Sequence, residues 1–170
     1  SNSGKNQEIY KVSSSGSLVW PDGNKVKGIV SNFQMTPKGL AIVSAVADGG
    51  KSVLAAKGQS NISFLSQSNG EDLWEKAPKT KGYVQHFYVM DDGILFGIAE
   101  GGINKISFEG TPLFKKPLST GENIHTMALT KQGMIYITDE DANIINLTTG
   151  ESIWNKPIKY KKAKAVTSTY

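Results

Sequence analysis

The chain of 170 residues contains no cysteine and no arginine, and all 19 of its basic residues are lysines. Without cysteine there can be no disulfide, no thiolate nucleophile and no cysteine-ligated zinc site. Arginine is the residue that usually contacts guanine edges and phosphates with two hydrogen bonds, whereas lysine acts as a hydrated point charge. The net charge of +4 therefore indicates solubility or weak attraction to anions, and it argues against specific nucleic-acid recognition.

The sequence also lacks long hydrophobic runs and any helical periodicity. Its longest apolar runs, such as residues 39–46, are too short to cross a bilayer. The first six residues are polar, so no signal peptide is visible in the given chain. A hydrophobic content of 38% and a charged content of 20% are typical of a folded globular domain. We therefore expect residues 1–170 to form a single domain or a piece of one.

One motif recurs four times: a glycine followed, four residues later, by a large aromatic residue. The pairs are Gly16 and Trp20, Gly70 and Trp74, Gly110 and Phe114, and Gly150 and Trp154. The last three aromatics are evenly spaced along the chain, and the interval between the first two is longer. The even spacing gives a self-similar period of roughly 40 residues, which is typical of repeat architectures.

Each repeat contains short runs rich in β-branched and aromatic residues, separated by turn signals such as Asp91-Asp92-Gly93. In the third repeat the expected strands cover residues 83–89, 93–98 and 103–107, followed by the glycine–aromatic element. Four short antiparallel strands in each such period describe one blade of a β-propeller. The predicted fold class is therefore all-β, with three complete four-stranded blades and a partial blade at each end. The expected blades cover about residues 7–23 (partial), 27–78, 82–118, 122–158 and 163–170 (partial), with an extended hairpin in the second blade around residues 47–58.

The glycine and the aromatic of the motif are predicted to be structural. Burying a large aromatic at the same point of every blade docks that blade onto its neighbour. Replacement of Trp74 or Trp154 by alanine is therefore expected to cost about 3–5 kcal/mol. The glycine is expected to supply a turn with positive φ before the outer strand.

The segments Thr149–Trp154 and Asn69–Trp74 resemble the Thr-Gly-x-x-x-Trp repeat of the PQQ-like (quinoprotein-type) β-propellers, over roughly residues 7–170. No WD40 pattern is present, because no aspartate follows any tryptophan. The resemblance implies a bacterial, extracytoplasmic protein, either periplasmic or secreted. Quinone-dependent dehydrogenases of this family share a vicinal disulfide, which the absence of cysteine excludes here. We therefore expect a non-catalytic member with no cofactor.

Polar side chains gather at the starts of the innermost predicted strands, which would line the mouth of a propeller channel. They form either a small polar or pH-sensitive binding patch, since histidine titrates near neutrality, or a set of groups that hydrogen-bond water and backbone; the second interpretation is favoured. Two histidines without a third ligand do not predict a metal site. The candidates are Ser31, Asn32, Gln85, His86, His125 and Thr126, with Thr167 and Ser168 in the last strand.

Two further stretches attract attention and are interpreted as solvated connections. Asp139–Asn143 begins like a calcium-binding loop, but Ile144 stands where that loop requires glycine and Gly150 where it requires glutamate. The lysine-rich segment 156–164 could attract an anionic surface, although such runs are more often flexible connections.

The predicted function is a non-catalytic interaction module that binds a protein partner through its loops or its channel face. One alternative is a hydrolase or lactonase-type propeller with an ion at the channel mouth. Another is a carbohydrate-binding propeller, for which Tyr83 and Tyr88 are the candidate aromatics. Partial blades leave open sheet edges. They would be resolved by four-bladed closure, by a homodimer that completes an eight-bladed ring, or by the remainder of a longer chain, which is the option we favour.

Overall fold

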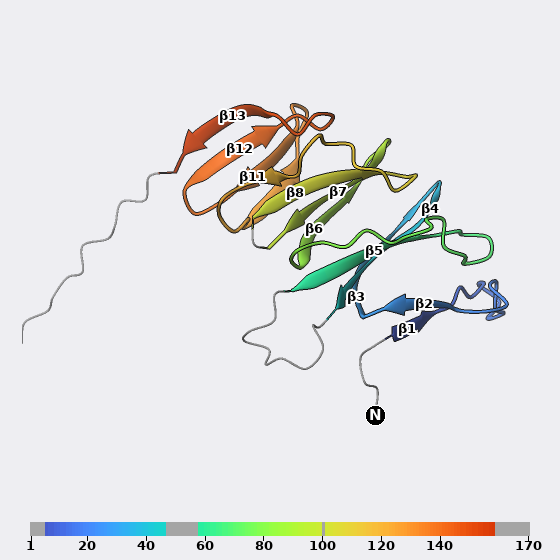
Figure 1. Ribbon diagram of the computed structural model, residues 1–170. Helices are drawn as coiled ribbons and strands as arrows, with labels where there is room; N and C mark the ends of the chain where they lie inside the picture. Colours follow the sequence, from blue (N-terminus) through green and yellow to red (C-terminus); the bar gives the residue numbers. More distant parts are fainter. Residues whose placement is uncertain (1–5, 47–57, 100, 159–170) are drawn as a thin grey trace, which may run out of the picture.

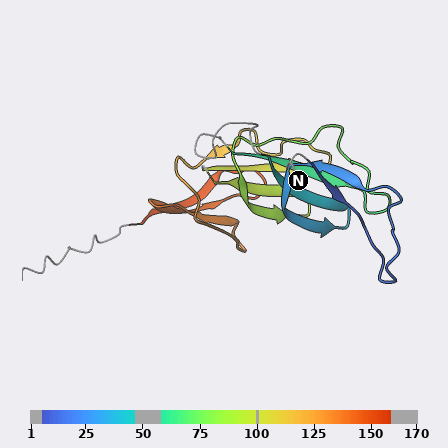
Figure 2. The same ribbon diagram turned by 90° about the horizontal axis from the view of Figure 1, so that it is seen from below.

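The computed structural model describes residues 6–46, 58–99 and 101–158, and all regular structure in these ranges is β-strand. The strands form antiparallel sheets that follow one another in chain order, from the blue N-terminal sheet to the red C-terminal sheet (Figure 1). The same row of sheets is seen from below in Figure 2. The all-β, blade-type fold is thus confirmed. The predicted hairpin extension at residues 47–57 and the predicted last strand at residues 163–170 lie outside the described residues.

The third and fourth blades are complete four-stranded sheets in simple meander order. The third blade consists of β6 (Val84–Val89), β7 (Gly93–Ile98), β8 (Gly102–Ser107) and β9 (Leu118–Ser119). The fourth blade consists of β10 (Thr126–Leu129), β11 (Met134–Ile137), β12 (Asp141–Ile145) and β13 (Ser152–Pro157). Within the described residues there is no helix, and hence no helical segment that could cross a membrane.

The first two blades have fewer regular strands. The second blade contains β3 (Ile29–Thr36), β4 (Gly39–Val46) and β5 (Gln59–Leu65), and its fourth strand is reduced to two isolated bridges, Leu65 with Asp72 and Asn61 with Lys79. The partial first blade pairs β1 (Asn6–Ile9) with β2 (Asn24–Lys27). Its outer strand therefore extends to Lys27, past the expected end at residue 23.

A β-bulge near the start of the inner strand decides which side chains face the preceding blade. In β6 the register shifts between Val84 and His86, so Gln85 is the extra residue. An extra residue reverses the alternation of side chains along a strand. Val84, Phe87 and Val89 consequently share one face and pack into the core between the second and third blades.

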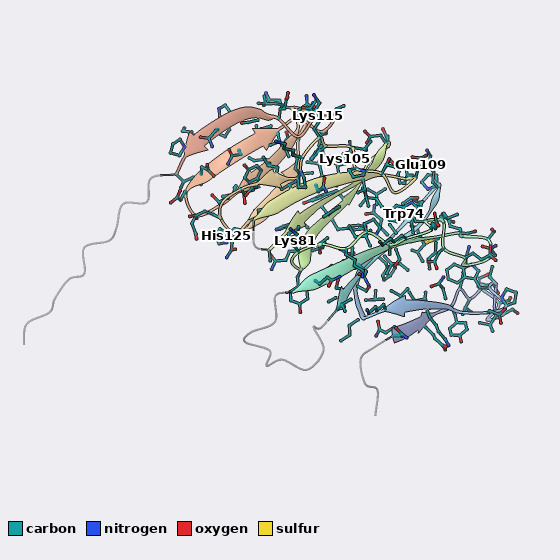
Figure 3. The ribbon with its side chains drawn as sticks, viewed as in Figure 1. Trp74, Lys81, Lys105, Glu109, Lys115 and His125 are labelled. Carbon is teal, nitrogen blue, oxygen red and sulfur yellow. The ribbon has the colours of Figure 1, made fainter. Side chains whose placement is uncertain are left out.

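The glycine–aromatic motif forms the contact between consecutive blades. A Cβ atom placed on Gly70 would lie 2.6 Å from the ring of Trp20, and one on Gly110 would lie 3.2 Å from the ring of Trp74. Figure 3 shows Trp74 between the sheets of the second and third blades. In the same way, a Cβ atom on Gly150 would lie 2.8 Å from the ring of Phe114. The motif glycine is therefore required for close approach as well as for its turn.

The predicted turn conformation of the motif glycines is confirmed. The φ angles of Gly16, Gly70, Gly110 and Gly150 are 84°, 77°, 86° and 75°. Residues with a Cβ atom rarely adopt this left-handed conformation, whereas glycine does so readily.

The expectation that all four motif aromatics are buried is wrong for Trp154. Trp20, Trp74 and Phe114 are between 1% and 6% exposed, whereas Trp154 is 43% exposed. The physical reason is that each aromatic is covered by the blade that follows it, and no described residue covers Trp154 in this way. The predicted cost of about 3–5 kcal/mol for Trp154→Ala is therefore too large.

A hydrogen bond to a backbone carbonyl accompanies each blade contact. The indole Nε1 of Trp20 donates to the oxygen of Gln67 at 3.0 Å, and that of Trp74 donates to the oxygen of Phe108 at 2.7 Å. Phe114 of the third repeat has no N–H group. At that contact a different residue supplies the donor.

The donor at the third contact is the buried ammonium group of Lys105, which is 2% exposed. Its Nζ donates to the oxygen of Leu147 at 2.7 Å and to the carboxylate of Asp92 at 2.7 Å. A buried charge requires a partner and hydrogen bonds, and both are present here. At the first contact Lys11 and Trp20 both donate to the oxygen of Gln67. At the third contact Lys105 is the donor and no tryptophan N–H accompanies it.

Substitution of Lys105 by methionine tests the contribution of this hydrogen bond. The variant leaves the carbonyl of Leu147 without its donor, and we expect a loss of about 1–3 kcal/mol in the free energy of unfolding. Phe114→Trp is expected to restore part of this loss when combined with Lys105→Met, and to give no gain alone. Urea unfolding followed by far-UV circular dichroism measures the four members of the cycle. Strictly additive effects would contradict the use of one acceptor, the carbonyl of Leu147, by both side chains.

Candidate functional site

The predicted channel-mouth residues of the second and third blades occupy equivalent bulges. Ser31 and Gln85 are the extra residues near the starts of β3 and β6, and both are exposed. The hydroxyl of Ser31 donates to the oxygen of Val43 in its own blade at 3.3 Å. Asn32 is exposed and is paired with Val43 in the β3–β4 register. Among the described residues no hydrogen bond joins this group to the polar residues of the next blades.

The two histidines lie in different environments. His86 is half-buried beside Gly97, and its Nε2 lies 3.5 Å from the oxygen of Ile124 in the fourth blade. His125 is exposed, and its Nε2 lies 2.8 Å from Oδ1 of Asp139 in the same blade. In Figure 3 it lies toward the same end of the sheets as Lys81. The fold therefore brings His86 next to the backbone that precedes His125, but the two imidazoles have different partners.

The remaining predicted residue of the patch, Thr126, is exposed at the first position of β10 and is paired with Ile137. Its backbone position matches the prediction for the start of an inner strand. No side-chain contact connects it with either histidine in the described part of the chain.

The turn that resembles a calcium loop is held together by its own side chains. The carboxylate of Asp141 accepts hydrogen bonds of 2.8 Å from Thr138 Oγ1, Asn143 Nδ2 and Asn155 Nδ2. Burial raises the pKa of Asp141, but these three hydrogen bonds outweigh it and leave the pKa below its usual value. Asp141 thus organises a hairpin turn.

Neighbouring carboxylates perturb Glu122, which lies close to this turn. Its pKa is raised by desolvation and then by the negative charges of Glu140, Asp139 and Asp141, and it is partly lowered by His125. Across residues 6–46, 58–99 and 101–158, no three histidine or acidic side chains are placed so that they could hold a metal ion.

A groove of about 1000 Å³ lies between β1 and β3. Its floor is apolar and includes Trp20, Leu40 and Ile42, together with Phe33 and Met35 of β3. Phe33 is 66% exposed and Met35 is 50% exposed. Exposed apolar side chains that line a groove together are typical of an interaction surface.

The bulge at Ser31 explains why the apolar side chains of β3 face the groove together. It places Val30, Phe33 and Met35 on one face of the strand. Their equivalents in β6 follow one repeat later at a constant spacing, and they are Val84, Phe87 and Val89.

The equivalent face of β6 shows what normally covers these positions. Val84, Phe87 and Val89 pack against a core that includes Ala41 and Val43 of β4 in the preceding blade. The partial first blade has no corresponding strand among the described residues. Among the described residues, Phe33 and Met35 of β3 therefore lack the cover that Phe87 and Val89 have in β6.

Polar groups and a free sheet edge surround this apolar floor. In the described part of the chain β1 pairs only with β2, so one edge of its backbone is open. Gln7 Oε1 accepts a 2.7 Å hydrogen bond from the backbone N–H of Val30 and ties β1 to the bulge of β3. Glu8 and Lys25, 3.7 Å apart, lie on the rim. Sequence analysis missed the groove, although the match in spacing between β3 and β6 was a signal that could have located it.

Tyr83 and Tyr88, the two aromatic residues proposed for carbohydrate binding, make different contacts. The hydroxyl of Tyr88 donates to the oxygen of Met127 at 2.6 Å and so belongs to the contact between the third and fourth blades. Tyr83 is 38% exposed, and its ring lies against Gly58. The structure does not assemble them into one aromatic surface.

Comparisons with known proteins identify the fold and not the family. No family model and no curated protein matches the chain. The crystal structure of the computationally designed Ika8 protein aligns with a TM-score of 0.58 and 13% identity, over 89% of this chain and 48% of the designed one. Residues 644–1017 of HIRA align with a TM-score of 0.44 and 7% identity, over 74% of this chain and 40% of that one. The chain therefore spans about half or less of the structures it matches, and the likeness to the designed protein supports the fold alone.

Proposed function

We propose that this chain is a non-catalytic β-propeller scaffold that binds a protein partner, taking an extended strand of the partner into the groove along β1. The observation that supports the proposal is the exposure of Phe33 and Met35 on β3. Their equivalents in β6, Phe87 and Val89, pack against a core that includes residues of the preceding blade. A partner strand that pairs with an open sheet edge gains backbone hydrogen bonds, and pockets for alternate side chains provide specificity.

The covered face of β6 indicates the chemistry of the partner strand. There the cover includes β4, whose alternate residues Ala41 and Val43 belong to the buried cluster against which Phe87 packs. A small aliphatic residue followed by a branched one at i and i+2 is therefore the pattern that fits the groove. The open edge of β1 supplies the hydrogen bonds along the strand.

The PQQ-like family, the extracytoplasmic location and the absence of a cofactor are parts of the same proposal. The family and the location rest on the resemblance of Asn69–Trp74 and Thr149–Trp154 to the family motif. The absence of a cofactor rests on the lack of cysteine, which excludes the vicinal disulfide of the quinone-dependent members. The groove lies outside the polar channel-mouth patch, which makes binding of a partner strand independent of His86 and His125.

A peptide that carries residues 39–46, flanked by lysines for solubility, tests the groove directly. We expect saturable binding to the intact chain, measured by nuclear magnetic resonance titration. Phe33→Asp is expected to weaken it about 10–100-fold, because the buried area of one phenylalanine is lost and a charge is placed on the groove floor. A peptide with lysines in place of Ala41 and Val43 is expected not to bind.

Leu129→Asp is the matched control. Leu129 is the equivalent of Met35 in the fourth blade, is 54% exposed, and does not line the groove. This variant should bind the peptide as the wild type does. The absence of saturation with the wild-type chain, or equal binding by the Phe33→Asp variant, would refute the proposed function.

A further inference from the structure

The series of blade contacts leaves one aromatic and one glycine without a partner among the described residues. Trp154 is 43% exposed, although the other motif aromatics are buried. Gly16 has no heavy atom within 4 Å of the position that its Cβ would occupy, whereas Gly70, Gly110 and Gly150 each lie against an aromatic ring. The chain thus contains both sides of one further blade contact, the aromatic Trp154 and the glycine Gly16, and neither has a partner among the described residues.

The aliphatic residue that normally lies under the aromatic is also uncovered at the same place. Leu65, Ile106 and Ile145 occupy equivalent positions, each in a bridge beside the motif, and are between 0% and 3% exposed. They belong to the clusters that contain Trp20, Trp74 and Phe114 respectively. The equivalent residue of the first repeat is Val12, which is bridged to Leu18 and is 54% exposed. Among the described residues, Val12 and Gly16 therefore form an unoccupied contact surface of the kind that binds a motif aromatic in the other blades.

The turns before the motif glycines alternate in length along the chain. Ser13 and Ser107 donate their backbone N–H to the carbonyl four residues later, at Ser17 and Thr111. In the second and fourth repeats the acceptor is five residues later, since Ser66 donates to Glu71 and Asn146 to Glu151. The first and third repeats therefore form one type, and the second and fourth repeats form another.

The type of residue at one position near each turn alternates in the same way as the length of the turn. Two residues before the turn, the first and third repeats have Lys11 and Lys105, and the second and fourth have Phe64 and Ile144. Both lysines donate to a carbonyl of the following blade, Lys11 to Gln67 at 3.0 Å and Lys105 to Leu147 at 2.7 Å. A blade of the second type is followed by one of the first type at the contact between Trp74 and Gly110. The fourth blade is of the second type, so the surface that matches it is that of the first repeat.

We propose that Trp154 of one copy docks over Val12 and Gly16 of a second copy of this chain. The contact repeats the one between Trp74 and Gly110. There Trp74 Nε1 donates to the residue that follows the first residue of the turn, Phe108. The corresponding acceptor for Trp154 is the carbonyl of Ser14 in the second copy.

Each copy offers both surfaces, so the same contact made twice closes a pair head to tail. The groove and this contact share the lining residue Val12, but different side chains test them. Phe33 lies on the groove floor outside the contact, and Trp154 on β13 does not line the groove. Peptide binding and self-association can accordingly fail separately.

Sedimentation velocity over about 1–500 µM protein measures the association of the intact chain. We expect a concentration-dependent equilibrium between monomer and dimer. For Trp154→Ala we expect a dimer dissociation constant at least tenfold higher than that of the wild type. Ile153→Ala is the matched control. Ile153 is 52% exposed and is adjacent to Trp154 on β13, and neighbouring residues of a strand point to opposite faces. This control is expected to associate as the wild type does.

A mixing experiment distinguishes a head-to-tail contact from a symmetric one. Val12→Lys and Trp154→Ala are each expected to be largely monomeric, whereas an equimolar mixture forms a dimer through the one contact that keeps both surfaces intact. Far-UV circular dichroism confirms that both variants are folded. A wild-type chain that stays monomeric at every concentration would overturn the proposal, as would association that Trp154→Ala leaves unchanged. Failure of the mixture to associate, or growth beyond a dimer, would overturn the closed head-to-tail pair.

Discussion

Trp74→Ala is expected to lower the free energy of unfolding by about 3–5 kcal/mol. Trp74 is 6% exposed, its ring centroid lies 5.3 Å from that of Phe64, and its indole N–H donates to the oxygen of Phe108 at 2.7 Å. Truncation opens a cavity between two blades and leaves a buried carbonyl without its donor. Urea unfolding followed by far-UV circular dichroism measures the loss.

Trp154→Ala provides the internal comparison, because it removes the same side chain from the same motif. Trp154 is 43% exposed, so we expect a loss below about 1 kcal/mol in the monomer. The measurement should be made at low protein concentration, where a second copy does not cover the residue. Equal losses for the two variants would contradict the assignment of the motif aromatics to blade contacts.

Gly70→Ala is expected to cost about 2–5 kcal/mol, the sum of a backbone cost and a packing cost. The φ of 77° costs a residue with a Cβ atom about 1–2 kcal/mol. The added methyl group would also lie 2.6 Å from the ring of Trp20, and overpacking of this kind costs about 1–3 kcal/mol. Thermal unfolding followed by circular dichroism measures the shift.

Gly16→Ala separates the two causes. Gly16 has a similar φ of 84°, but nothing lies within 4 Å of its Cβ position. Only the backbone term applies, so the expected loss is about 1–2 kcal/mol. If Gly16→Ala destabilised the monomer as much as Gly70→Ala, close approach of the aromatic would not be the second role of the glycine.

The strands were largely predictable because their signals are local. The run predicted at residues 83–89 forms β6 at Val84–Val89, and the run at residues 93–98 forms β7 with the same bounds. The fourth blade was expected to begin at residue 122, whereas its first strand, β10, starts at Thr126. Turn residues and alternating side chains specify a strand within a few positions, whereas its ends depend on the partner strand.

The site was much less predictable. Sequence analysis selected the polar residues at the starts of the inner strands, and the structure gives His86 and His125 separate partners. The groove escaped prediction because Phe33 has the same local pattern as Phe87. Phe33 is exposed because no strand of the first blade covers it within the described residues, as β4 of the second blade covers Phe87.

The sequence by itself determined the number of motif copies, the positive-φ turns at their glycines and the order of the strands. These properties depend on residues within a few positions of each other. Only the tertiary structure decided that the buried Lys105 donates to Leu147 of the next blade. It also decided that Phe33 and Trp154 are exposed among the described residues. Each of these depends on whether a segment from a neighbouring repeat packs on the residue, and burial by another blade leaves no mark in the local pattern.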